Sequence, residues 1–113
     1  MTGAQSAADA GGEATQTGVS LVVPTLGRPS LRRLLEALAQ AWSAELGPVE
    51  LLLVDDRPVP QGALPVPEQL RPVTTVVQSR GVGPAGARNR GWRTARYGRG
   101  GFLDDDVLPQ PDW

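Results

Sequence analysis

The sequence contains no cysteine and no histidine. The lack of cysteine excludes disulfide bonds, thiolate nucleophiles and cysteine-based metal sites. The lack of histidine removes the commonest general base and the commonest metal ligand. A metal ion would therefore have to be held by oxygen atoms, which favours Mg²⁺, Mn²⁺ or Ca²⁺.

Long apolar runs and an excess of charge are also missing. No segment approaches the roughly 20 apolar residues of a transmembrane helix, so no membrane span is predicted. The net charge is −1, and all 11 basic residues are arginine. The chain as a whole therefore has no charge bias toward polyanions. Its 113 residues allow one domain with a small core.

Residues 1–18 are small and polar, without a basic start followed by an apolar segment. This is not the pattern of a secretory signal peptide. It predicts a disordered leader, followed by a domain over residues 19–113. The predicted localisation is cytoplasmic, at the inner face of the membrane if the full-length protein is longer.

Apolar segments and turn signals predict four β-strands and two helices. The first helix has Ser30 as its candidate N-cap, and its apolar residues recur at helical spacing as far as Leu46, before Gly47. The second helix begins at Pro84 and ends before Gly98. The strands are predicted over residues 19–24, 49–54, 73–78 and 100–106.

The order of these elements predicts an α/β fold, a Rossmann-like and mostly parallel sheet with flanking helices. The strands are apolar throughout rather than alternating, which is typical of parallel strands covered on both faces. In such sheets ligands bind at the carboxyl ends of the strands. All four strand ends carry polar or glycine-rich sequence here, so a binding site is predicted at that edge.

Charged residues follow the first three predicted strands. Asp55 and Asp56 come after the second strand, where a carboxylate can accept hydrogen bonds from a ribose or a base. The alternative for this pair is a cap or an ion pair with Arg57. Arg28 and Arg80 stand at two other strand ends, where they could meet a diphosphate or pair with the aspartates.

Three adjacent aspartates follow the fourth predicted strand. Residues two apart share a face of a strand, so Asp104 and Asp106 are expected to converge while Asp105 points away. Like charges this close need a cation, such as Mg²⁺ bridging to a phosphate oxygen. The alternative is a solvated acidic turn.

A G-x-G-x-x-G pattern, formed by Gly81, Gly83 and Gly86, lies between a predicted strand and a helix. It matches the dinucleotide fingerprint, with Asp104 near the place of a ribose-binding acid. Against this, it follows a complete β-α-β unit rather than opening the domain. The other interpretation is that these glycines let the backbone approach a ligand, beside a helix N-terminus that favours an anion.

Three arginines, Arg90, Arg93 and Arg96, share one face of the second predicted helix. This pattern is typical of a solvated face, so no nucleic-acid partner is predicted. Trp92, in the same helix, is expected to pack.

Four segments, VSLVVPTLGR, ELLLVDD, GPAGARNRG and FLDDDVLPQPDW, resemble in that order the N-terminal half of family 2 glycosyltransferases with the GT-A fold. The resemblance covers residues 19–113. It implies an inverting transferase that uses a UDP-, GDP- or dTDP-sugar donor with Mn²⁺ or Mg²⁺. The acceptor stays open and could be a glycan, a lipid or a small molecule.

The resemblance also implies roles for residues at the first two strand ends. Pro24 and Thr25 would border the nucleoside. Arg28 would lie near the diphosphate. Asp56, with Asp55 as its neighbour, would take the base.

At the other strand ends the resemblance places the remaining donor contacts. Arg80 falls where the family often has another nucleotide contact, and Asp104 would face the ribose or the metal. Asp106 would ligate the ion that bridges the diphosphate. Asp105, the middle residue of this D-x-D motif, and Gly83 complete the expected nucleotide-binding residues.

The sequence departs from the family by ending after the D-x-D motif. In the family, the later half supplies the acceptor site and the acidic general base that an inverting displacement needs. The base is therefore expected beyond Trp113, no catalytic residue is assigned, and residues 19–113 are expected to be a truncated GT-A domain with little activity alone. A dinucleotide-binding oxidoreductase domain and a non-catalytic nucleotide- or metal-binding module remain as alternatives.

Overall fold

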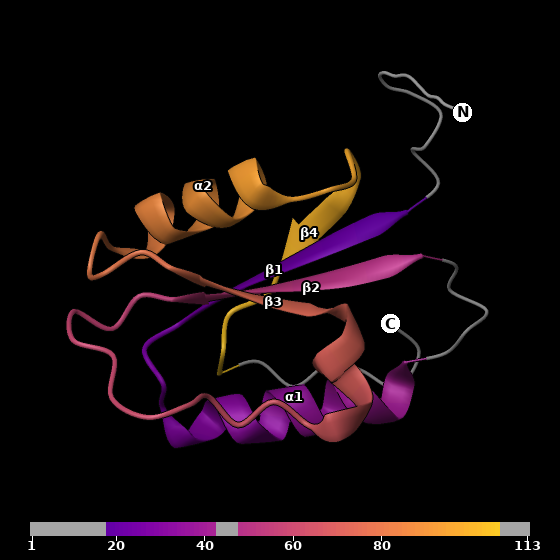
Figure 1. The fold of residues 1–113 in the computed structure, drawn as a ribbon, viewed down its shortest axis with the longest axis horizontal. Coiled ribbons are helices and arrows are strands. Elements are labelled where there is room, and N and C mark those ends of the chain that lie inside the picture. Colours follow the sequence, from indigo (N-terminus) through magenta and orange to yellow (C-terminus); the bar gives the residue numbers. More distant parts are fainter. Residues whose placement is uncertain (1–17, 43–47, 107–113) are drawn as a thin grey trace.

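The sheet and its helices follow the predicted order (Figure 1). The computed structural model describes residues 18–42 and 48–106. Within them, parallel strands pair in the order β3-β2-β1-β4, which confirms the predicted α/β class. The elements are β1 (Val19–Thr25), α1 (Pro29–Ala41), β2 (Val49–Asp55), the 3₁₀ helix η4 (Glu68–Val73), β3 (Thr74–Gln78), α2 (Pro84–Thr94) and β4 (Gly100–Phe102).

One face of the sheet is covered by α1 and η4 (Figure 1). The leucines of α1 recur at intervals of three and four residues, so they form a single buried stripe along the helix. This stripe packs on alternate strand residues, because every second side chain of a strand faces the same way. The core on this side consists of Leu21, Val23, Leu31, Leu34, Leu35, Leu38, Leu51, Leu53 and Leu70.

The opposite face of the sheet is covered by α2 and has a smaller core. Val22, Leu52 and Val54 face this side and pack with Ala87 of the helix. Gly91 is buried one turn further along α2. A Cβ atom at this position would lie 2.5 Å from Val22 Cγ1 and 2.8 Å from Val54 Cγ2. The missing side chain therefore lets α2 approach the sheet closely.

The ends of α1 differ from the prediction. The helix begins at Pro29, so Ser30 is its second residue rather than its N-cap, and no side chain caps this end. Proline suits the first turn because its fixed φ is already helical and its missing N–H has no partner there. The helix ends at Ala41, and the predicted end at Leu46 and Gly47 lies outside the described residues.

The later elements are shorter than predicted. α2 ends at Thr94 and so stops well before Gly98. β4 ends at Phe102, because its pairing with β1 stops at Val22. The three aspartates are therefore not part of a strand. The predicted leader up to residue 17 lies outside the described residues.

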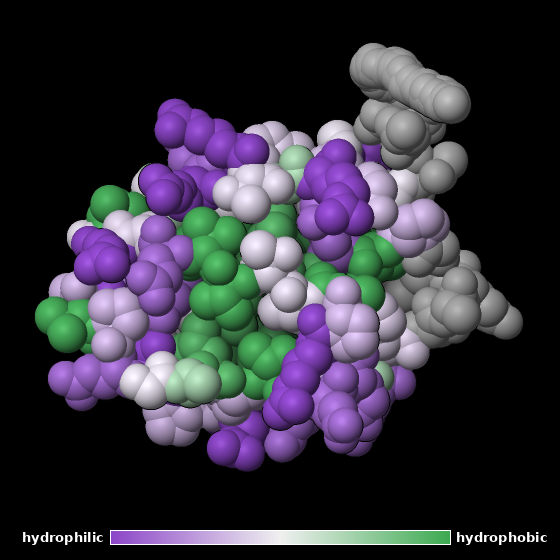
Figure 2. All heavy atoms as spheres, in the orientation of Figure 1, coloured by the Kyte–Doolittle hydropathy of each residue, from purple (hydrophilic) through white to green (hydrophobic). Residues whose placement is uncertain are grey.

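The described sheet has β3 and β4 as its two edges. Apolar side chains gather on the side of the molecule where β3 lies (Figure 2), and Val76 of β3 is 49% exposed. None of the helices in the described ranges is both long enough and apolar enough to cross a membrane.

We expect Gly91→Ala to destabilise the fold by about 1–3 kcal/mol, because the added methyl group overpacks the smaller core. Helix propensity alone predicts the opposite sign, since alanine is favoured over glycine by about 1 kcal/mol. Urea unfolding followed by circular dichroism measures the difference. Asn89→Ala, at an exposed position of the same helix, serves as the control and should stay within about 0.5 kcal/mol. A stabilised Gly91→Ala variant would contradict the close packing of α2.

Candidate functional site

A cavity of about 550 Å³ opens at the carboxyl ends of the strands. Residues that follow all four strands line it, as the sequence predicts for this edge of a parallel sheet. The predicted site residues at the cavity are Pro24, Thr25, Arg28, Asp56, Gly83, Asp104, Asp105 and Asp106. Asp55 and Arg80 are not among the lining residues.

Asp56 connects the end of β2 to the loop that precedes α2. Its Oδ1 accepts hydrogen bonds from Ser79 Oγ at 2.6 Å and from Val82 N at 2.9 Å, and its Oδ2 accepts from Gly83 N at 3.0 Å. The side chain is buried. Burial opposes ionisation, but these hydrogen bonds outweigh it and lower the pKa of the carboxyl group. The carboxylate therefore holds the start of α2 in place.

The loop around this carboxylate passes through left-handed backbone conformations. Gly81 and Gly83 have φ values of +76° and +91°, and Arg80 has a φ of +57°. Glycine adopts such values without steric cost, which explains two of the glycines in the G-x-G-x-x-G pattern. Gly81 N also donates to the Asp56 carbonyl at 3.0 Å. The Arg80 side chain is exposed and is not among the residues that line the cavity.

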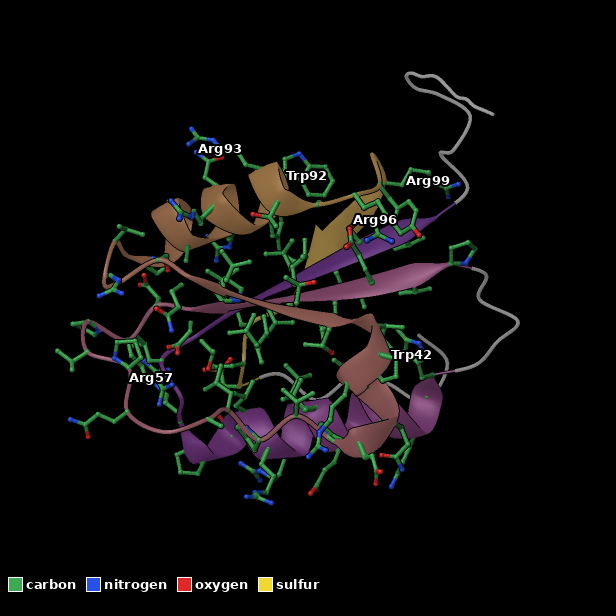
Figure 3. The ribbon with its side chains drawn as sticks, viewed as in Figure 1. Trp42, Arg57, Trp92, Arg93, Arg96 and Arg99 are labelled. Carbon is green, nitrogen blue, oxygen red and sulfur yellow. The ribbon has the colours of Figure 1, made fainter. Side chains whose placement is uncertain are left out.

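Asp55 forms a buried ion pair instead of facing the cavity. Arg57 Nε donates to its Oδ1 at 2.8 Å, and Arg57 Nη2 donates to its Oδ2 at 2.7 Å. The same guanidinium donates to the carbonyls of Gln61 and Gly62 at 2.7 and 3.0 Å, in the loop after β2 where Figure 3 labels Arg57. The hydrogen bonds from Arg57 lower the pKa of Asp55, although burial opposes them. The ion pair, named from the sequence as the alternative, is what the structure contains.

Of the three aspartates, Asp105 points differently from the prediction. Asp105 does not point away, because the strand ends before it and it lies in a turn. Its side chain is buried, and its Oδ2 accepts a hydrogen bond from Thr25 Oγ1 at 2.8 Å. Asp104 and Asp106 are exposed at the cavity. Asp104 pairs with Arg88 at 3.5 Å.

The donor set at the cavity suits a cation that is shared with a ligand. In residues 18–42 and 48–106, no three acidic side chains are grouped closely enough to hold a metal ion by themselves. Mg²⁺ commonly takes only one or two carboxylates and completes its shell with phosphate oxygens and water. The exposed carboxylates of Asp104 and Asp106 fit that second arrangement.

Two supporting residues were not found from the sequence. Ser79 is buried and donates to Asp56, and Pro58 lines the cavity next to the loop that Arg57 holds. The available signal was position, because Ser79 directly follows β3 at the edge where ligands bind.

A parallel sheet with a cavity at its carboxyl edge defines a Rossmann-like α/β protein. The profile of Glycosyl transferase family 2 matches residues 20–113, and the chain therefore belongs to this family. The predicted membership is confirmed, and the sheet with its helices is the N-terminal part of a GT-A fold. No curated protein matches the sequence.

Solved structures of TarS from S. aureus are similar to the chain. For "TarS 1-349" the TM-score is 0.68 with 25% sequence identity, and the match covers 84% of this chain and 29% of that one. For the crystal structure of TarS the TM-score is 0.62 with 26% identity, and the match covers 79% of this chain and 16% of that one. The chain thus spans less than a third of either structure.

Thr25→Val should destabilise the fold by about 1–3 kcal/mol, because the buried Asp105 carboxylate loses its hydroxyl donor. The valine keeps the shape of the threonine side chain, so urea unfolding reports mainly on the two lost hydrogen bonds, the one donated to Asp105 and the one accepted from Gly27 N at 2.9 Å. Thr75→Val, at an exposed position of β3, is the matched control and should change stability by less than about 0.5 kcal/mol. Equal effects of the two variants would show that the Thr25–Asp105 bond contributes nothing.

The Asp55–Arg57 pair should make stability fall with acid. In the unfolded chain an aspartate takes up a proton near about pH 3.9, whereas Arg57 keeps the pKa of Asp55 lower in the fold. The stabilisation is therefore complete above about pH 5 and is lost as the pH falls through the folded-state pKa. Arg57→Gln should lose less stability than the unaltered chain between about pH 5 and pH 3 in urea unfolding.

Arg33→Gln is the control for this pH dependence, because Arg33 is exposed on α1. It should keep the pH dependence of the unaltered chain. If Arg57→Gln also kept this pH dependence, the Asp55–Arg57 pair would not be its source.

Proposed function

We propose that the cavity binds the nucleotide-sugar donor of an inverting glycosyl transfer, together with Mn²⁺ or Mg²⁺. The observation that supports this most is the convergence of two different groups at one cavity in a family 2 chain. One group is the glycine-rich loop held by Asp56, and the other is the exposed carboxylate pair of Asp104 and Asp106.

The nucleoside would lie against the ends of β1 and β2, where Pro24 and Thr25 line the cavity. A carboxylate has about four acceptor positions. Three hydrogen bonds to Asp56 come from the protein's own Ser79, Val82 and Gly83. The remaining position can accept an N–H group of a base without displacing any of them. Asp55 would support the nucleoside site indirectly, because its pair with Arg57 fixes the loop that follows β2.

The diphosphate would lie between the arginine side and the acidic side of the cavity. Arg28 lines it after β1, and its guanidinium can form two parallel hydrogen bonds to a phosphate. Asp104 and Asp106 would hold the ion. When bound, the metal neutralises the charge that develops on the leaving diphosphate. Arg80 has no role in this arrangement.

The part of the reaction assigned to this chain is donor binding. Inverting transfer also needs a base that deprotonates the acceptor hydroxyl, and no residue of the chain is assigned that role. Transfer to a glycan, a lipid or a small molecule is therefore proposed for the whole enzyme, because the chain covers 29% of the TarS 1-349 structure.

Calorimetric titration with UDP, GDP, dTDP and NAD, each with and without Mn²⁺, tests the donor site. We expect one of the nucleoside diphosphates to bind at least about tenfold more tightly with Mn²⁺, which corresponds to about 1.4 kcal/mol. Asp106→Asn should remove this metal dependence, because it neutralises one of the two exposed carboxylates. Glu36→Gln, which neutralises an exposed acid on α1, should leave it unchanged.

Other outcomes separate the alternatives. Binding of NAD without metal would point to a dinucleotide-binding domain instead. Binding of Mn²⁺ without any effect on nucleotides would point to a metal-binding module. Unchanged metal dependence in Asp106→Asn would remove that residue from the ion site.

A further inference from the structure

The positive charge of the chain is concentrated in one segment. Six of the 11 arginines lie within residues 80–99, and no acidic residue occurs between Glu68 and Asp104. The net charge of the whole sequence is nevertheless −1. The arginines are therefore segregated from the acids rather than mixed with them, although well-solvated surfaces commonly interleave both signs.

The fold presents most of this segment on the outer side of α2. The helix turns Ala87 and Gly91 toward the sheet, which leaves Arg90 and Arg93 exposed. Figure 3 shows Arg93, Arg96 and Arg99 on the α2 side of the sheet, around the C-terminal end of that helix. The salt bridges formed within the described ranges involve none of Arg90, Arg93, Arg96 and Arg99.

Two aromatic side chains on the α2 side of the sheet are also exposed. Trp92 and Phe102 are 38% and 47% exposed. Their ring centroids are 6.0 Å apart, with the rings tilted by 55°. Trp92 therefore packs against Phe102 but stays partly exposed. Folding brings Phe102 of β4 next to α2, which no pattern within one element of the sequence indicates.

These side chains define a surface that we call the α2 basic face, consisting of Arg90, Trp92, Arg93, Arg96, Arg99 and Phe102. We propose that the α2 basic face docks on the surface of an anionic lipid bilayer. The arginines complement the negative headgroups. Trp92 and Phe102 are suited to the boundary between headgroups and acyl chains, where aromatic residues concentrate.

Two observations favour a bilayer over a nucleic acid. Bases stack on the free faces of aromatic rings, and the tilted contact between Trp92 and Phe102 covers part of each ring. The arginines also spread over a helix and the loop after it, and a fluid lipid surface imposes no fixed spacing on them. A nucleic acid, by contrast, presents phosphates at a regular repeat.

Docking through this face would leave the donor cavity open. The cavity lies at the N-terminal end of α2, where Gly83 and Arg88 line it. Arg88 pairs with Asp104 there and is not part of the α2 basic face. The proposal therefore adds a membrane-surface contact that does not depend on which donor is bound.

Vesicle flotation with the full chain tests the proposal. We expect binding to vesicles of phosphatidylcholine mixed with phosphatidylglycerol, and little binding to phosphatidylcholine alone. Raising the salt from about 0.1 M to about 1 M should release the chain, because the Debye length falls from about 10 Å to about 3 Å. Equal binding to both kinds of vesicle would overturn the proposal.

Charge removal locates the contact. Replacing Arg90, Arg93 and Arg99 together by glutamine should lower the partition coefficient about 100-fold, because each contributes roughly a fivefold factor at an anionic surface. Arg96 is left unchanged, so that this variant and its control each lose three positive charges. Circular dichroism checks that the variant folds.

The matched control replaces Arg32, Arg33 and Arg71 by glutamine, which removes the same charge from exposed positions on α1 and η4. It should change the partition coefficient less than about threefold, since these side chains belong to the other face of the sheet. Equal losses in the two triple variants would overturn the proposal. So would binding of a single-stranded RNA that depends on the same three arginines while vesicles stay unbound.

Trp92→Ala tests the aromatic part of the contact. It should weaken binding to the anionic vesicles while leaving the salt dependence in place, because the arginines remain. Unchanged binding in this variant would mean that only the charges of the α2 basic face contribute to binding, and it would contradict the role proposed for the ring.

Discussion

The buried carboxylate of Asp56 is the interaction on which the site depends. It sits at the end of β2, yet its partners Ser79, Val82 and Gly83 all belong to the connection between β3 and α2. An ionised group survives burial only when several donors compensate for its lost water. The loop must therefore fold around the charge, and this sets where α2 begins and which helix residues reach the cavity or face outward.

The sequence was sufficient for the architecture because burial leaves periodic patterns. The uniformly apolar strands and the leucine spacing of α1 predicted a parallel sheet with covered faces, and the structure has both. The parallel sheet in turn predicted a binding site at the carboxyl ends of its strands, which is where the cavity lies. Element ends were less accurate, because local features such as a proline or the end of strand pairing decide them. α1 begins at Pro29, and β4 ends where its pairing with β1 stops.

Side-chain directions at the site could not be predicted from local pattern alone. Alternation along a strand holds only while the strand lasts, and Asp105 turns inward because the pairing with β1 has already stopped. The sequence left two possible partners for Asp55, a ligand or Arg57. The structure has the pair with Arg57, whose guanidinium also binds the following loop. The Trp92–Phe102 pair joins a helix to a strand, so no single-element pattern contains it.

The central position of β1 has a consequence for the order of assembly. Thr25 ends the first strand to be synthesised. Its hydroxyl group donates to Asp105, which comes 80 residues later, so this hydrogen bond cannot form until then. Domains generally fold as units, and β1, α1, β2 and β3 are all synthesised before β4. Contacts between distant residues are also the slow ones to form. The acidic side of the cavity is thus the last part of the described fold to be synthesised, and the cavity cannot be complete until those residues follow β4.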